Sequence, residues 1–167
     1  APFSTLLEEF LIVTHIGDLM WTGYPSHGDA RENKETGWMS SACLLVRRAA
    51  FDQIGLLDEG YFIYGDEADL QYRLNQAGWK VVFLPNSSII HFGGRSMDRW
   101  KRRKMVYRGK MMFYKKNYGL PSAFLLRLLF FFMSLLKLLV WVVGFVVPSK
   151  NDQAKKELRS NIDVMAL

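Results

Sequence analysis

Cysteine and histidine are scarce in this chain, which limits the disulfides and the metal sites that it can form. Cys43 is the only cysteine, so an intrachain disulfide and a cysteine-rich metal site are both impossible. Of the three histidines, His15 and His27 lack metal-ligand spacing. Because Cys43 lies within an apolar run, we expect an inert core thiol, and a single cysteine fits a reducing compartment.

A signal peptide and internal repeats are also missing from the sequence. The first residues, APFS, contain no initiator methionine and no basic region ahead of an apolar stretch. We therefore interpret the chain as a processed form or as a fragment that begins inside a larger domain. Its 167 residues suffice for one ordinary domain with a buried core.

The net charge of +6 belongs to one segment of the chain. Residues 1–96 carry seven basic and twelve acidic residues, whereas residues 97–147 carry eleven basic residues and only Asp98 as an acid. A mildly acidic globular part is therefore joined to a basic and then apolar part. We predict part of an α/β domain over 1–96, a basic amphipathic helix over 97–119, a hydrophobic membrane segment over 120–148 and a polar C-terminal tail over 149–167.

Hydrophobic periodicity predicts the elements of the acidic part. Glycines at 55 and 78 are expected to end two helices, and Asp66 is a natural N-cap for the second. This order fits an α/β domain that has too few strands to be complete. The expected elements are a helix over 6–20, a polar loop over 21–37, a strand over 38–46, helices over 48–54 and 66–77, and strands over 79–84 and 88–92.

Three carboxylates gather where an aromatic run and a glycine lead into the second helix: Asp66, Glu67 and Asp69. Close carboxylates raise each other's pKa, so such a cluster is a candidate for proton abstraction or cation handling. Asp66 also suits helix capping, and Asp69 can form an ion pair with Arg73 one turn later. The residues alone leave catalysis and helix capping both open.

Basic and apolar residues interleave over 97–119, as in helices that lie on a membrane surface. The segment that follows holds only Arg127 and Lys137 as charges, and its length suffices to cross a hydrocarbon core. About sixteen strongly apolar residues outweigh the roughly 3 kcal/mol that Lys137 costs. A chain of this size has too little protein to surround such a helix as core. Spanning and in-plane arrangements both remain open.

The cationic flank precedes the apolar segment, which predicts that residues 1–116 lie on the cytoplasmic side. A basic helix can also bind nucleic acid through phosphate groups. Its continuity with an apolar segment instead favours anionic lipid head groups or a phosphate-bearing lipid substrate. We therefore expect a membrane partner and no nucleic-acid partner.

Ordered motifs cover residues 38–96: WMSSACLLVRR at 38–48, Phe51, GLLDE at 55–59, FIYGDEADL at 62–70, Arg73, AGW at 77–79 and IHFGGRS at 90–96. Together they resemble the second half of a family 2 glycosyltransferase of the GT-A fold, most closely the bacterial rhamnosyltransferases. In that family the nucleotide-sugar pocket and an Asp-x-Asp metal motif precede this stretch. No Asp-x-Asp occurs upstream here. The resemblance implies a partial GT-A domain whose donor half lies in a missing segment or on a partner chain.

The resemblance implies an inverting reaction in which a carboxylate deprotonates the acceptor hydroxyl while a divalent cation, Mn²⁺ or Mg²⁺, stabilises the leaving nucleotide diphosphate. The usual pair of the family is Glu-Asp with the second residue as base, and this chain reverses the pair. Glu67 therefore matches the base, with Asp66 as the second candidate. Asp69 matches a position that lines the acceptor side or braces the helix.

Four further residues are candidates for cation or substrate contacts, and of these only His91 takes its role from the resemblance. His91 matches a cation-coordinating histidine, and Arg95 suits a bidentate contact to a diphosphate. Trp38 and Tyr64 are candidates for stacking on the acceptor sugar. Each has a structural alternative: a satisfied imidazole for His91, a surface ion pair for Arg95, and core packing for the two aromatic residues.

The expected function is that of the acceptor-side portion of a membrane-associated, metal-dependent glycosyltransferase in bacterial cell-wall or polysaccharide biosynthesis. It would transfer a sugar, with rhamnose as the candidate, from a nucleotide-sugar donor to a lipid-linked or polysaccharide acceptor at the cytoplasmic face of the cell membrane. The alternative is a non-catalytic membrane-anchored scaffold, or a truncated remnant, that binds no donor.

Overall fold

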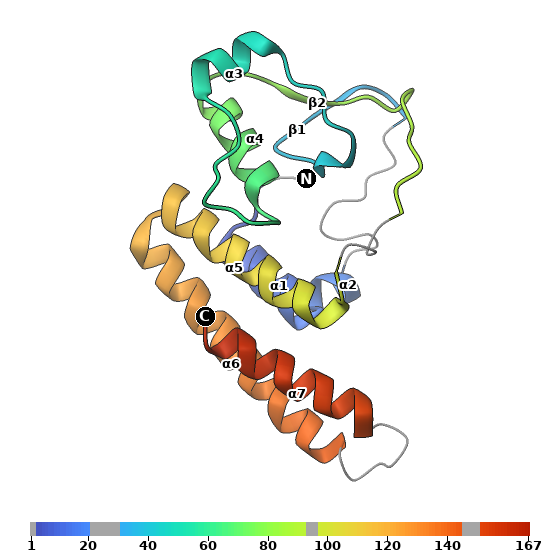
Figure 1. Cartoon of the computed structure of the whole chain (residues 1–167), viewed down its shortest axis with the longest axis vertical. Helices are drawn as coiled ribbons and strands as arrows, with labels where there is room; N and C mark the ends of the chain where they lie inside the picture. Colours follow the sequence, from blue (N-terminus) through green and yellow to red (C-terminus); the bar gives the residue numbers. More distant parts are fainter. Residues whose placement is uncertain (1–2, 21–30, 93–96, 145–150) are drawn as a thin grey trace. The chain divides into compact units, whose positions relative to one another are not determined.

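Two compact units make up the chain, residues 1–92 and residues 93–167. The computed structural model describes residues 3–20, 31–92, 97–144 and 151–167, which are drawn in colour in Figure 1. Helices predominate in both units, and the described residues form one sheet of two short strands. The GT-A fold itself is a property of the family that the sequence resembles, and the described part contains only a small portion of such a sheet.

The first unit begins with helices α1 (Leu6–Thr14) and α2 (Ile16–Met20). A capping box starts α1, because the Thr5 hydroxyl accepts the Glu8 N–H while the Glu8 carboxylate accepts the Thr5 N–H at 2.6 Å. Between the helices His15 adopts a left-handed φ of 60°, which interrupts the helical hydrogen bonds. The helix predicted over 6–20 is thus confirmed, but as two helices.

The core of the first unit lies between α3 (Arg48–Ile54) and α4 (Asp66–Gln76). Gly55 and Gly78 have φ values of 80° and 83° where these helices end, which confirms both predicted ends. Gly65, and not Asp66, is the N-cap of α4, so the predicted Asp66 cap is wrong. The core consists of Ala50, Leu70 and Leu74, with Leu44, Val46, Phe51, Ile54 and Trp79 packed around them.

The sheet pairs β1 (Lys34–Thr36) with β2 (Val81–Phe83) in antiparallel register, Lys34 opposite Phe83. β2 confirms the strand predicted over 79–84, whereas β1 falls in a segment expected to be a loop. The strands predicted over 38–46 and 88–92 are wrong: the first holds a 3₁₀ helix, Ser41–Cys43, and the second has no regular structure. A strand needs a neighbour that pairs its backbone groups, and no described segment supplies one at either place.

The apolar run at 38–46 is also less buried than expected. Leu44 and Val46 pack on the core, but the side chain of Leu45 is 98% exposed. Cys43 is exposed, so the expected core thiol is wrong. Apolar composition alone identified a segment that packs on α3 and α4 without showing which of its side chains would be covered.

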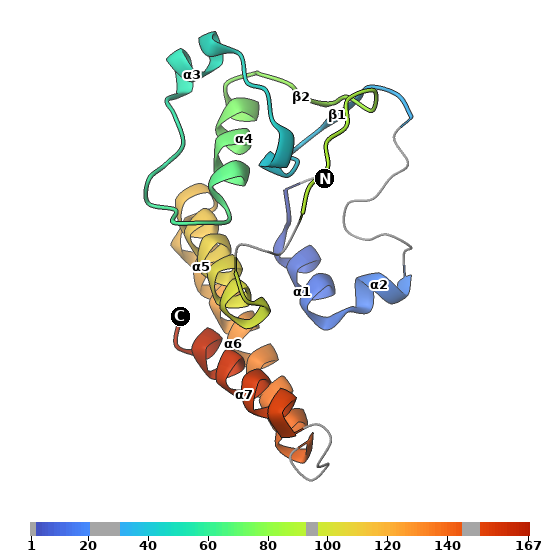
Figure 2. The same cartoon turned by 45° about the vertical axis from the view of Figure 1, so that its right-hand side comes forward.

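The second unit consists of three helices, α5 (Arg99–Asn117), α6 (Gly119–Gly144) and α7 (Asn151–Met165). The Asp98 carboxylate caps α5 by accepting the Trp100 N–H at 2.9 Å, and Tyr118 ends that helix. α5 lies within the helix predicted over 97–119, and α6 confirms a helix in the apolar segment predicted over 120–148, of which residues 145–148 lie outside the described residues. Residues 149–167, expected as a polar tail, contain α7, which lies along the C-terminal half of α6 in both views (Figures 1 and 2).

Small and aromatic residues pack the three helices together. The buried side of α6 presents Ala123, Leu126, Phe130 and Ser134, which are spaced three and four residues apart along one face. The ring of Tyr107 on α5 stacks on Phe130 with ring centroids 4.2 Å apart. α7 contributes the buried residues Ala154, Glu157, Ser160, Asn161 and Val164.

Candidate active site

The segment that enters α4 has an unusual backbone. Tyr64 and Gly65 have φ values of 64° and 98°, so two consecutive residues occupy the left-handed region. For a tyrosine this conformation is strained and persists only when the surroundings hold it. The sharp turn places Asp66 and Glu67 in the first turn of α4, where the positive end of the helix dipole favours negative charge.

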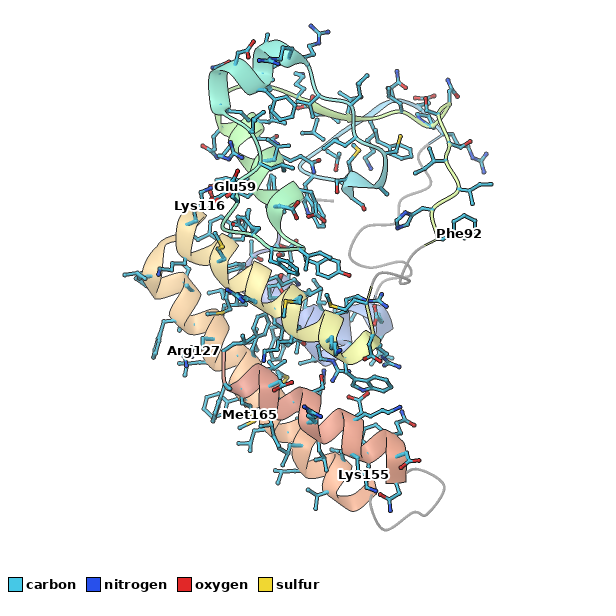
Figure 3. All side chains as sticks on the ribbon, viewed as in Figure 1. Glu59, Phe92, Lys116, Arg127, Lys155 and Met165 are labelled. Carbon is cyan, nitrogen blue, oxygen red and sulfur yellow. The ribbon has the colours of Figure 1, made fainter. Side chains whose placement is uncertain are left out.

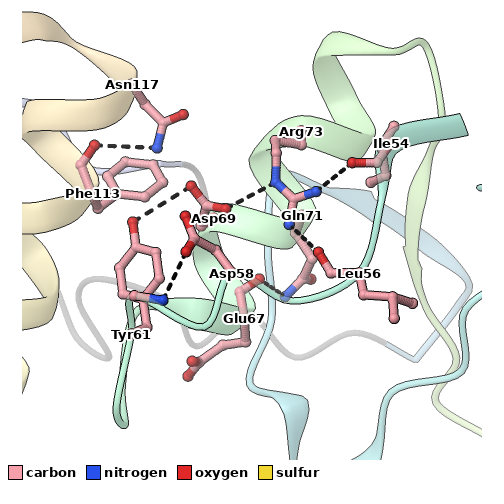
Figure 4. Close-up of polar contacts among 11 residues, drawn as sticks. Ile54, Leu56, Asp58, Tyr61, Glu67, Asp69, Gln71, Arg73, Phe113 and Asn117 are labelled. Atoms are coloured by element: carbon pink, nitrogen blue, oxygen red, sulfur yellow. Dashed lines mark hydrogen bonds and ion pairs between the residues drawn. The ribbon is translucent and has the colours of Figure 1, made fainter. Parts of the chain in front are cut away.

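Glu67 is half-buried, and its side chain is hydrogen-bonded to the backbone just before it in the sequence. Its Oε2 accepts the Gly65 N–H at 3.2 Å. Burial raises the pKa of the Glu67 carboxyl, a hydrogen bond with Asp66 raises it further, and backbone N–H groups lower it in part. Figure 4 shows the carboxylate of Glu67 pointing away from Asp69 and Arg73. A carboxylate with a raised pKa that is not tied to an arginine is suited to accept a proton.

Asp69 has a different environment, because it is fully buried. Its Oδ2 accepts the Arg73 Nε–H at 2.9 Å, and the Tyr61 hydroxyl donates to Oδ1 at 3.5 Å. Burial, followed by the charge of Asp69, raises the pKa of the Tyr61 phenol. The ion pair expected between Asp69 and Arg73 is confirmed. Of the two roles open to Asp69, these contacts support bracing rather than acceptor binding.

Arg73 extends the brace to the loop between α3 and α4 (Figure 4). Its two terminal nitrogens donate to the carbonyl oxygens of Ile54 and Leu56, both at 2.7 Å. The end of α3 and the start of the loop are thereby joined to the side of α4. This loop carries the Tyr61–Gly65 segment, which leads directly into α4. The Asp69–Arg73 pair therefore fixes the backbone just before Glu67.

Two amides of α4 hold the segment that contains Trp38, and the sequence analysis did not identify them. Gln71, fully buried, donates to the Met39 carbonyl at 2.7 Å and accepts the Met39 N–H at 2.9 Å. It also donates to the Glu67 carbonyl at 2.8 Å. Asn75 donates to the Gly37 carbonyl at 2.9 Å. Their signal in the sequence is two amides one turn apart on a helix whose other side is apolar.

These contacts bring the backbone around Trp38 beside the first turns of α4. Tyr64, Asp66 and Glu67 lie at the start of the same helix, and Trp38 and Tyr64 are both half-buried. Phe62, 83% exposed in the adjacent loop, is an apolar surface that sequence reasoning missed. The arrangement offers a proton acceptor at the start of α4, with Tyr64 just before the helix and the exposed ring of Phe62 in the adjoining loop.

The predicted metal ligand His91 is not part of a metal site in the described part of the chain. His91 is exposed in a segment without regular structure, and Arg95 lies outside the described residues. In the described ranges, no group of three or more His, Cys, Asp or Glu side chains could hold a metal ion. The carboxylates of Asp66 and Glu67 are oxygen ligands of the kind that Mn²⁺ and Mg²⁺ prefer, but the described residues place no third protein ligand beside them.

The matched region of a protein-family comparison coincides with this site. Residues 27–109 match the family model described as glycosyltransferase like family 2. The N-acetylglucosaminyl-diphospho-decaprenol L-rhamnosyltransferase of Mycobacterium tuberculosis is 41% identical over 78 residues, which are 47% of this chain and 25% of that protein. No solved structure matches the chain.

Two further relatives are named for O-antigen biosynthesis and for rhamnosyl transfer. The O-antigen biosynthesis protein RfbC of Myxococcus xanthus is 38% identical over 87 residues, 51% of this chain and 6% of that protein. Rhamnosyltransferase WbbL of Escherichia coli is 34% identical over 55 residues, 33% of this chain and 21% of that protein. The match spans a quarter or less of the length of each of these relatives.

Proposed function

Because residues 27–109 belong to glycosyltransferase family 2, we propose that this chain is the acceptor-side portion of an inverting glycosyltransferase. Rhamnose is the proposed sugar, and a lipid-linked or polysaccharide molecule is the proposed acceptor, since the relatives are named for rhamnosyl transfer and O-antigen synthesis. The observation that carries the proposal is the half-buried Glu67 at the start of α4, with the Trp38 segment bonded beside it through Gln71.

In the proposed reaction Glu67 accepts the proton of the acceptor hydroxyl. The hydroxyl oxygen forms a bond to the anomeric carbon of the donor sugar as the bond from that carbon to the nucleotide diphosphate breaks. The electron pair of the broken bond leaves with the diphosphate, and attack from the opposite side inverts the anomeric centre. Only an ionised carboxylate can take the proton, so Glu67 must be deprotonated before attack.

The remaining residues would orient the substrate and hold the base. Trp38, Phe62 and Tyr64 are the proposed surfaces for the apolar face of an acceptor sugar. Asp69 and Arg73 act as positioning residues, because they fix the loop from which Tyr64 and Glu67 emerge. A divalent cation with His91 as ligand stays a prediction that rests on the resemblance, and a diphosphate contact from Arg95 stays a prediction that rests on the chemistry of its guanidinium.

Exposed apolar side chains of the first unit support the proposal that further protein covers it and supplies the donor site. Isolated exposed apolar residues are ordinary, but many in one small unit indicate a covered surface. The relatives are also several times longer than the matched stretch. Apart from Phe62, the most exposed of these side chains belong to Leu7, Leu19, Leu45, Leu56, Ile90 and Phe92.

Calorimetry with dTDP and UDP, in the presence of Mn²⁺, tests the proposal together with a transfer assay. We expect weak nucleotide binding by the 167-residue chain and measurable binding plus sugar transfer once the chain is joined to the segment that carries the donor site. The rival reading is a non-catalytic membrane-anchored scaffold. It would be supported if the joined protein bound neither nucleotide and transferred no sugar from dTDP-rhamnose to a lipid-linked acceptor.

A further inference from the structure

One side of α6 is entirely apolar and exposed. The segment Gly119–Val142 is long and apolar enough to cross a membrane, and only 22% of its most apolar window is buried in the structure. Apolar side chains project from α6 on the side away from α7 (Figure 3). We call this side the outer face, and it comprises Phe124, Leu125, Phe131, Phe132, Leu136, Leu139, Val140 and Val142, each at least 37% exposed.

The charges of α6 avoid this outer face. Lys137 is half-buried on the opposite side, three residues after the buried Ser134. Burial lowers the pKa of Lys137, the nearby Arg103 lowers it further, and Glu157 acts in the opposite direction. Arg127 is exposed, and by helical spacing it lies at the edge of the buried face, three residues before Phe130. The charge that weighed against membrane insertion therefore points into the protein.

Ion pairs bind α7 to α5 across this buried side. The Arg103 guanidinium on α5 donates to the Glu157 carboxylate on α7 at 2.7 Å, and Glu157 is 4% exposed. Lys104 lies 3.7 Å from Asp163, and the Lys156 ammonium stands 5.0 Å from the ring centroid of Trp100. Detaching α7 would separate Glu157 from Arg103 and take the Glu157 carboxylate away from Lys137.

A spanning α6 is incompatible with an attached α7. α7 lies beside the C-terminal half of α6 and would enter the hydrocarbon with it (Figures 1 and 2). That helix carries six charged residues, and charged side chains are the costliest of all to place at the bilayer centre. They are Asp152, Lys155, Lys156, Glu157, Arg159 and Asp163. With the three helices packed as they are, α6 can meet lipid only from its outer face.

We propose that the three helices α5, α6 and α7 form a docking surface that lies flat on an anionic lipid bilayer, with the outer face of α6 immersed at the depth of the lipid head groups and upper acyl chains. Charge complementarity selects the lipid, because the exposed cations of this unit far outnumber its exposed acids. The exposed cations of α5 and α6 include Lys101, Arg108, Lys115, Lys116 and Arg127. This inference does not depend on the glycosyltransferase activity.

Co-sedimentation with vesicles of phosphatidylglycerol and phosphatidylcholine tests whether the outer face of α6 binds an anionic bilayer. We expect binding that weakens in high salt and on vesicles of phosphatidylcholine alone. Phe132→Asp should weaken binding about tenfold or more, since it places a charge in the outer face. Leu45→Asp is the matched control, because it puts the same charge on an exposed leucine of the other unit. Equal loss in both variants, or dimers without vesicle binding, would overturn the proposal.

The depth of α6 distinguishes a flat helix from a spanning one. In a Cys43→Ser background, a fluorophore at single cysteines replacing Phe124, Phe132 or Leu139 reports depth through quenching by lipids that are brominated at known acyl positions. A flat helix places all three at one shallow depth. Depths that pass through the bilayer centre at 132 would show that α6 spans and that α7 has detached, which would contradict the proposal even if the Phe132→Asp variant failed to fold.

Discussion

Replacement of Glu67 by glutamine is expected to lower the rate of sugar transfer by about 10²–10⁴-fold in the intact enzyme, because the amide cannot accept the proton of the acceptor hydroxyl. Glutamine keeps the size of the side chain and its oxygen can still accept the Gly65 N–H. The fold should therefore persist, which circular dichroism checks. Transfer is measured with radiolabelled donor in the protein that includes the donor half.

The pH profile of the unmodified enzyme adds a second readout. The pKa of Glu67 is raised by burial and by Asp66, so the acid limb of kcat/KM should lie at a higher pH than an ordinary glutamate would give. A raised carboxyl pKa stabilises the fold below the unfolded-state pKa, and this contribution is lost as pH rises through the folded-state pKa. At neutral pH, Glu67→Gln should thus be as stable as the parent or more stable in thermal denaturation.

Asp66→Asn is the matched control for the base assignment. It removes the neighbouring charge and hydrogen bond that raise the pKa of Glu67, so the acid limb should move to lower pH while most of the transfer rate remains. The opposite pattern, near-parent turnover in Glu67→Gln and loss of activity in Asp66→Asn, would assign the base to Asp66.

Replacement of Asp69 by alanine should destabilise the first unit by about 3–5 kcal/mol, because it leaves the Arg73 guanidinium largely buried without its partner. Arg73 is only 21% exposed and Asp69 is fully buried. The hydrogen bond from Tyr61 is lost as well. Urea unfolding followed by tryptophan fluorescence measures the change, since Trp38 and Trp79 both lie in this unit.

Asp52→Ala provides a matched control in the same unit. Asp52 pairs with Arg48 one turn away at 2.8 Å, nearly the 2.9 Å of the Asp69–Arg73 pair, but both partners are exposed. An exposed pair of this kind contributes about 1 kcal/mol or less. If both variants lost equally little stability, and Asp69→Asn raised the KM for the acceptor without affecting the fold, Asp69 would be an acceptor-binding residue and not a brace.

Helices were predictable from sequence because their signals are local. The apolar spacing and the glycines at 55 and 78 identified α3 and α4, and the basic and apolar runs identified α5 and α6. Strands were predicted poorly, since each depends on a distant partner: β1 pairs with β2 across more than forty residues. The apolar run around Leu45 met no such partner.

The candidate site, like the helices, was predictable only where its signals are local in the sequence. Adjacent carboxylates and the Asp69–Arg73 spacing are visible in the chain, whereas the bonds from Gln71 to Met39 and from Arg73 to Leu56 join segments that are far apart in sequence. The different environments of Glu67 and Asp69 follow from burial, which depends on what packs over each residue. Sequence comparison, not geometry, identified the family.

Residue order was enough to specify the acidic cluster, the apolar helix and the family, because short-range spacing and composition carry them. The tertiary structure decided the other features. It pairs Asp69, and not Glu67, with Arg73, and it places Lys137 near Arg103 and Glu157. It also shows that residues 151–165 form a helix against α6. The surroundings of Lys137 include Arg103 and Glu157, which come from two other helices, and that meeting exists only in the folded chain.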